Sequence, residues 1–122
     1  MDFEVEAAPI GDGATLISVY GELDLATCGE LARVAGQSMS TPGPVILDLT
    51  ECPFIDSTGL REVLQISGPT QGDGAEVPVA IVSPAGSVTS DLFNLTGLDR
   101  FLKLCGTLED ATAWLSTQAD SD

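Results

Sequence analysis

The chain has 122 residues, and its 19 acidic side chains against 4 basic ones give a formal net charge of -15, with no histidine. This length fits a single domain, and the 43% of hydrophobic residues is enough for one packed core. The lack of histidine excludes Ser-His-Asp and Cys-His nucleophile pairs and histidine-bearing zinc sites, while the negative charge disfavours nucleic acid and anionic membrane surfaces as partners.

Two short strands are predicted at the start of the chain. Phe3, Val5 and Ala7 alternate with glutamates, which is the period-two pattern of a strand with one solvated face. The Gly-Asp-Gly segment at 11–13 indicates a turn, and residues 15–20 (TLISVY) read as the partner strand. We therefore expect an antiparallel hairpin at a sheet edge.

An amphipathic helix is predicted next, over residues 26–38, because apolar side chains recur there at three- and four-residue spacing. These side chains are Cys28, Leu31, Ala35 and Met39. The following run 45–49 (VILDL) is nearly apolar throughout, which is typical of a parallel strand covered on both faces. After a loop at 50–55, Leu60, Val63 and Leu64 indicate a second helix that ends at Gly68-Pro69.

The second half repeats the alternation of strand and helix. A polar, glycine-rich connector at 71–76 leads into an apolar strand at 77–82. Ser83-Pro84 is expected to open a third helix, with Ser83 as its N-cap. Its expected apolar stripe is Val88, Leu92 and Leu95, and Gly97 ends it. A short strand at 101–104 and a last helix follow, the helix marked by Leu108, Ala111, Trp114 and Leu115 and frayed from Gln118.

This order of elements predicts an α/β fold with a mixed, mostly parallel sheet of about five strands, an antiparallel N-terminal hairpin and about four helices. Residues 1–118 are expected to form one domain, and 119–122 a frayed C-terminal tail. In open sheets of this kind the functional surface lies at the carboxyl ends of the central strands. Here that place is the loop after Leu49, which leads into Asp56-Ser57-Thr58-Gly59.

The Ser57 hydroxyl is the candidate functional group of this loop. At the start of a helix, a phosphate on that oxygen would meet free backbone N–H groups and the positive end of the helix dipole. Gly59 has no side chain, so we expect it to let a partner or a phosphate approach closely. The alternative is that Ser57 is only an N-cap, which any strand-to-helix unit can use.

Three stretches of the chain, taken together, resemble the STAS family, the sulfate-transporter and anti-sigma-factor-antagonist domain. Residues 20–24 (YGELD) are similar to the family's GELD turn, and 45–60 (VILDLTECPFIDSTGL) to its apolar strand followed by D-S-[ST]-G. The segment from Phe93 to Phe101, with Thr96-Gly97-Leu98 inside it, is similar to the family's late F…TGL…F pattern. The resemblance covers almost the whole chain and implies a single STAS domain.

The resemblance implies a regulatory switch of the anti-anti-sigma type. Such a protein binds an anti-sigma factor that is also a serine kinase, and so releases a sigma factor. Phosphorylation of the serine in D-S-x-G breaks the complex, and a phosphatase restores it. By position the acceptor is Ser57, with Thr58 as the alternative acceptor. The expected partner-binding residues are Glu22, Asp24, Asp56, Ser57, Thr58, Gly59 and Arg61.

The physical basis of such a switch needs no catalytic group in this chain. A phosphate adds about -1.5 to -2 charges beside carboxylates, and like charges across an interface cost several kcal/mol. We therefore expect no enzyme activity, no cofactor and no metal. No P-loop is present, and the sole lysine, Lys103, does not fit a response-regulator receiver. The alternative function is an accessory subunit of a transporter or of a signalling assembly.

The N-terminus and the cysteines complete the expectations. Residues 1–4 are acidic, without the basic and apolar regions of a targeting segment, and no apolar run approaches about 18 residues, so we expect a cytoplasmic protein without membrane insertion. Cys28, Cys52 and Cys105 share no CxxC spacing and read as small apolar residues. A redox switch formed by two of them is the alternative, although Glu51 and Asp56 should disfavour a thiolate at Cys52.

Overall fold

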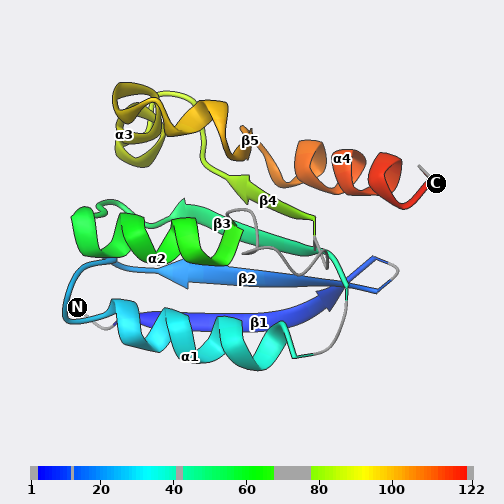
Figure 1. Cartoon of the computed structure of the whole chain (residues 1–122), viewed down its shortest axis with the longest axis horizontal. Coiled ribbons are helices and arrows are strands. Elements are labelled where there is room, and N and C mark those ends of the chain that lie inside the picture. Colours follow the sequence, from blue (N-terminus) through cyan, green and yellow to red (C-terminus); the bar gives the residue numbers. More distant parts are fainter. Residues whose placement is uncertain (1–2, 12, 41–42, 68–77, 121–122) are drawn as a thin grey trace.

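The structure, a computed structural model, describes residues 3–11, 13–40, 43–67 and 78–120. One sheet holds the five strands in chain order (Figure 1), namely β1 (Glu4–Ile10), β2 (Ala14–Tyr20), β3 (Val45–Glu51), β4 (Val79–Val82) and β5 (Lys103–Cys105). The helices are α1 (Cys28–Ser38), α2 (Ser57–Ser67), α3 (Val88–Thr96) and α4 (Leu108–Asp120), with the 3-10 turn η1 (Leu98–Arg100). The connector predicted at 71–76 lies outside the described residues.

The pairing of the strands confirms the predicted fold class. β1 and β2 are antiparallel, with Ile10 opposite Ala14, and the other neighbouring strands are parallel. The turn between β1 and β2 has positive φ angles of 60° at Gly11 and 86° at Gly13, a backbone conformation that glycine adopts without steric cost. The carboxyl ends of β2, β3 and β4 therefore meet at the same edge of the sheet.

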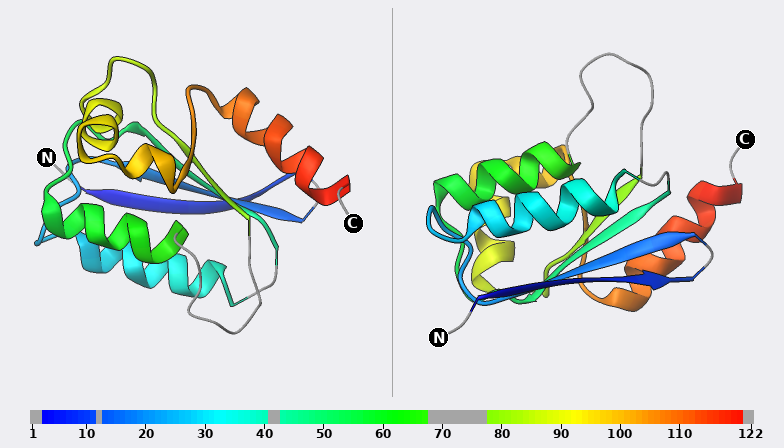
Figure 2. Two further views of the ribbon diagram at one scale, coloured as in Figure 1. Left: turned by 45° about the horizontal axis from the view of Figure 1, so that its top comes forward. Right: turned by 90° about the horizontal axis from the view of Figure 1, so that it is seen from below.

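The sheet is covered on both faces by helices. Figure 2 shows α1 and α2 on one side of the strands and α4 on the other. Leu31, Val63 and Phe93, from α1, α2 and α3, are fully buried in the first core layer. Ala111 and Leu115 of α4 pack in the second. β3 supplies both layers, with Leu47 in the first and Ile46 in the second, which confirms the buried strand predicted at 45–49.

The third helix begins later than the sequence predicts. Ser83 is not its N-cap; the cap is Ser87, whose side chain accepts a hydrogen bond from the Ser90 N–H at 3.2 Å. Ser83 is instead buried at the end of β4, with its hydroxyl oxygen 2.6 Å from that of Thr89. This contact fixes Thr89 on the inner face of α3, and Phe93, one turn further on, follows it into the core.

The apolar stripe expected on α3 is confirmed at Leu92, which packs against the first core layer, and is wrong at Val88 and Leu95, which are 55% and 84% exposed. Gly97 does end the helix, in the left-handed conformation with φ 78°. The turn η1 then shifts the last strand toward the C-terminus, and Phe101 is left 74% exposed outside it. α4 continues to Asp120, past the expected domain boundary at 118, and that boundary remains a prediction.

Candidate functional site at the start of helix α2

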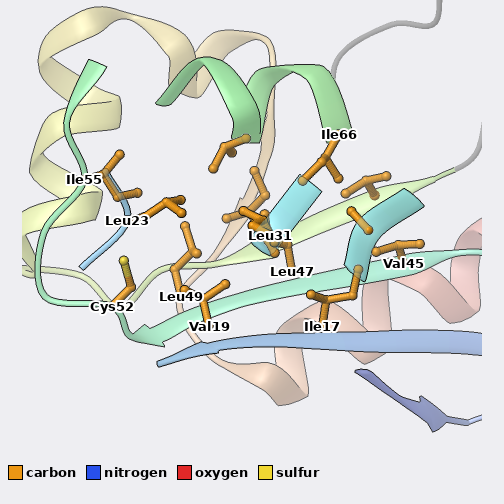
Figure 3. Close-up of a cluster of buried hydrophobic side chains, with 14 of the residues drawn as sticks. Ile17, Val19, Leu23, Leu31, Val45, Leu47, Leu49, Cys52, Ile55 and Ile66 are labelled. Carbon is orange, nitrogen blue, oxygen red and sulfur yellow. The ribbon is translucent and has the colours of Figure 1, made fainter. Parts of the chain in front are cut away.

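Two loops meet at the carboxyl ends of β2 and β3. They are residues 22–27 and 52–56, and we call them the paired loops. The Leu23 N–H donates to the Phe54 carbonyl at 2.9 Å, and the Asp56 N–H donates to the Leu23 carbonyl at 3.1 Å. The Leu23 side chain is fully buried, and Figure 3 shows it beside Ile55 of the other loop. Burial of Leu23 and these backbone bonds hold the paired loops together.

Asp56 is the N-cap of α2. One carboxylate oxygen accepts a hydrogen bond from the Gly59 N–H at 2.9 Å, which satisfies one of the free donors of the first helical turn. The other oxygen accepts from the Leu25 N–H at 3.3 Å, across the paired loops. Ser57 is then the first residue inside the helix. The alternative in which Ser57 serves as the N-cap is therefore wrong.

The Ser57 side chain is exposed, and its hydroxyl makes no hydrogen bond to the residues that the structure describes. Because Asp56 caps the helix, the Ser57 hydroxyl has no structural task in it. Thr58, the alternative acceptor, is half-buried. Ser57 is thus exposed at the start of α2, whereas its phosphorylation remains a prediction.

Gly59 has a different role from the one expected. It is buried, and a Cβ atom on it would lie 2.5 Å from the Leu23 carbonyl oxygen. The missing side chain therefore makes room for the chain's own 22–27 loop and does not open a path for a partner. Contact between Gly59 and a partner remains a prediction, which its burial against Leu23 disfavours.

The charged candidates fall into two groups. Asp24 is used inside its own loop, where one carboxylate oxygen accepts from the Ala26 N–H at 3.0 Å and the Thr27 N–H at 3.2 Å. Glu22 and Arg61 are exposed, Arg61 one helical turn after Ser57. The paired loops thus bring Asp24 and Asp56 to the edge that carries Ser57, but both carboxylates already hold backbone N–H groups.

Two exposed apolar side chains and one hydroxyl of this site were missed from the sequence. Leu25 is 75% exposed and Phe54 is 44% exposed, one on each of the paired loops. The Thr27 hydroxyl donates to the Glu22 carbonyl at 2.8 Å and braces the first loop. The spacing Asp24-x-x-Thr27 is a turn pattern that signals this bracing. Leu25 precedes α1 at three-residue spacing from Cys28, so the local pattern gave no signal of its exposure.

The three cysteines are free thiols. Burial raises the pKa of the Cys52 thiol, and the nearby Glu22 carboxylate raises it further. The expected rise of the Cys52 pKa is confirmed. The carboxylate that contributes to it is Glu22, and not Glu51 or Asp56, because the paired loops bring Glu22 close to Cys52. Burial likewise raises the pKa of the Cys105 thiol. A redox switch at Cys28, Cys52 or Cys105 remains a prediction that these two shifts disfavour.

No group of side chains suited to a metal ion is found among the described residues. In the same part of the chain, no helix has the length and apolar character needed to cross a membrane. The site consists of the exposed Ser57, the exposed Leu25 and Phe54 of the paired loops, and the Asp24 and Asp56 carboxylates that hold backbone N–H groups.

Comparison with protein-family models decides the family. The model of the STAS domain matches residues 7–111. The chain belongs to the STAS domain family. This STAS domain is 33% identical over 101 residues to the anti-sigma-F factor antagonist RsfB of Mycobacterium tuberculosis, across 82% of this chain and 80% of RsfB.

Solved structures agree with the assignment to the STAS fold. An anti-sigma factor antagonist from Mycobacterium paratuberculosis superimposes with a TM-score of 0.80 and 26% identity, over 94% of this chain and 95% of that one. The Bacillus cell fate determinant SpoIIAA in its phosphorylated form has a TM-score of 0.61 and 18% identity, over 90% and 97% of the two chains. At that identity the second likeness shows the fold alone.

Proposed function

We propose that this STAS domain is an anti-sigma factor antagonist, and that phosphorylation of Ser57 switches its binding off. The observation that carries the proposal is the accessible Ser57 hydroxyl, which is free of hydrogen bonds to the described residues and lies at the first position of α2. The similarity to RsfB, which is named an anti-sigma-F factor antagonist, supports the class of partner.

The surface around Ser57 has the chemistry of a protein-binding site. Leu25 and Phe54 offer exposed apolar area that stabilises a complex when it is removed from water. The exposed Glu22 lies on the same paired loops, in a chain of net charge -15. A partner with an apolar contact surface and a basic rim complements this arrangement, and its association should weaken as salt is added.

A phosphate on Ser57 would change this surface in two ways. It adds about -1.5 to -2 charges and a group that must stay hydrated, next to apolar side chains that the partner covers. It also adds bulk where a partner shaped around a hydroxyl has no room. Each 1.4 kcal/mol of such cost reduces affinity tenfold, so a modest clash is enough to end binding.

The proposal assigns the chemistry of the switch to the partners. An anti-sigma factor with serine kinase activity would supply the phosphoryl transfer, and a phosphatase would reverse it. Binding of the unphosphorylated domain to the anti-sigma factor would release the sigma factor. SpoIIAA, which shares the fold, exists in both unphosphorylated and phosphorylated forms, so the fold accommodates the modification.

The test begins with the site of modification. The full chain is incubated with ATP and candidate anti-sigma serine kinases, and peptide mass spectrometry locates the added phosphate. We expect one phosphate on Ser57, its loss in Ser57→Ala, and its retention in Thr58→Ala. Phosphate on Thr58 alone would move the acceptor by one residue, and the absence of phosphate with every kinase would contradict the switch.

The second measurement is the affinity of the unphosphorylated chain, and of its variants, for the anti-sigma kinase. Ser57→Ala should bind as the natural chain does, and Ser57→Asp should bind at least about tenfold more weakly, since 1.4 kcal/mol of repulsion suffices. Equal binding of both variants would support the alternative, an accessory subunit of a transporter or signalling assembly. In that case the chain should co-purify with a membrane complex or an ATPase.

A further inference from the structure

Arg61 has no acidic side chain one helical turn away on α2, although Glu62 follows it directly in sequence. The positions three and four residues away on α2 are Ser57, Thr58, Leu64 and Gln65, all uncharged. Arg33 on α1 offers the contrast, since Glu30 lies three residues before it and the two form an ion pair at 2.6 Å. Among the described residues, that is the only ion pair, although acidic side chains outnumber basic ones 19 to 4 in the whole chain.

We infer that Arg61 is a positioning residue for a phosphate on Ser57, which it pairs with in cis along α2. This inference rests on the proposed phosphorylation of Ser57 and adds a specific partner for the phosphate within the chain itself. It makes the phosphorylated form an ordered state, with the phosphate held over the first turn of α2.

The helix geometry supports this pairing. Residues four apart on a helix have Cβ atoms about 5–6 Å apart, and an anion placed N-terminal to the cation is the favourable order. Both side chains are exposed, so neither must leave a core contact to reach the other. A guanidinium can hold two phosphate oxygens at once, which gives a stronger and more directional contact than a lysine would.

The backbone leaves room for the same phosphate. The Gly59 N–H is bonded to the Asp56 carboxylate and the Leu60 N–H to the Asp56 carbonyl. The N–H groups of Ser57 and Thr58 have no hydrogen bond to any described residue. A phosphate on Ser57 can therefore contact these donors while its outer oxygens face Arg61.

The experiment places phosphoserine at residue 57 during synthesis of the full chain, so that no kinase is needed. Four proteins are compared, with and without the phosphate and with and without Arg61→Gln. We expect the phosphate to raise Tm by about 2 °C more with Arg61 present than in Arg61→Gln, which corresponds to one well-placed helical ion pair. Arg61→Lys should retain part of this difference.

A second readout is the 31P NMR titration of the phosphoserine. Loss of the guanidinium should move its midpoint to higher pH, because the doubly charged phosphate loses its cation. The difference between the variants should shrink in about 1 M salt, where the screening length is about 3 Å. Arg33→Gln is the control, since it removes an exposed arginine from α1 and should leave the titration unchanged.

Equal Tm shifts with and without Arg61, together with an unchanged 31P midpoint, would overturn the inference. That result would leave the proposed function intact, because the partner could still be repelled. Failure of the proposed function can likewise be told apart from failure of this inference. If no kinase modifies Ser57, the proposed switch fails, whereas the coupling between an installed phosphate and Arg61 is still measured.

Discussion

Gly59 of α2 packs directly against the backbone of Leu23, because a Cβ atom on Gly59 would lie 2.5 Å from the Leu23 carbonyl oxygen and 2.9 Å from its Cγ. The Leu23 carbonyl also accepts the Asp56 N–H. The start of α2 and the 22–27 loop therefore pack closely together, and the placement of the first turn of α2, with Ser57, depends on a contact with a residue far away in sequence.

Gly59→Ala should destabilise the protein by about 1–3 kcal/mol, because the new methyl group meets backbone atoms that cannot move away singly. Urea unfolding monitored by circular dichroism measures this change. Gly36→Ala is the matched control, since Gly36 lies in α1 with nothing within 4 Å of its Cβ position. At position 36, alanine should raise the free energy of unfolding by up to about 1 kcal/mol. Equal effects of the two substitutions would contradict the tight contact.

Asp56→Ala and Ser57→Ala should differ in stability although the residues are neighbours. Asp56→Ala removes the cap of α2 and the bond to Leu25, so the free energy of unfolding should fall by about 1–2 kcal/mol. Ser57→Ala removes an exposed hydroxyl without a bond to the described residues, and should change the free energy of unfolding by less than about 0.5 kcal/mol. Thermal unfolding compares the two; a larger loss for Ser57→Ala would return the cap to Ser57.

Leu25→Ser and Phe54→Ser should each weaken binding of the proposed anti-sigma factor about tenfold or more while leaving Tm nearly unchanged, because both side chains are exposed in the free chain. Phe101→Ser is the control. Phe101 is 74% exposed but precedes β5, and so lies toward the amino ends of the parallel strands. Isothermal titration calorimetry gives the affinities, and an equal loss with Phe101→Ser would place the interface elsewhere.

Alkylation of the native protein should distinguish the cysteines. At pH 8 iodoacetamide should modify half-buried Cys28 faster than Cys52 or Cys105, because burial limits access to both and their raised pKa values leave less thiolate. The Cys52 rate should increase further as the pH is raised, and all three should react alike in denaturant. Peptide mass spectrometry follows each site. Native Cys52 reacting as fast as Cys28 would revive the redox switch.

The order of strands and helices could be predicted from the sequence because each element carries its own local pattern. The alternation in β1 and the apolar run of β3 specify strands, and the three- and four-residue spacing of Leu31 and Ala35 specifies a helix. The position of Ser57 at a strand-to-helix junction followed from the same patterns. Each of these patterns is local, because it depends only on residues a few positions apart in the sequence.

The details that make the site work were decided by the tertiary structure. The Asp56 carboxylate reaches Leu25 across 31 residues of sequence, and Gly59 is required by Leu23, so neither role is visible in a local pattern. The inward face of α3 was likewise set by the contact between Ser83 and Thr89. Long-range packing selects which of several locally equivalent hydroxyls, carboxylates and apolar side chains is buried, bonded or left free. The sequence alone placed a serine at the helix start. The tertiary structure holds the Asp56 carboxylate between Gly59 and Leu25 as the cap of α2, which leaves the Ser57 hydroxyl without a bond to the described residues.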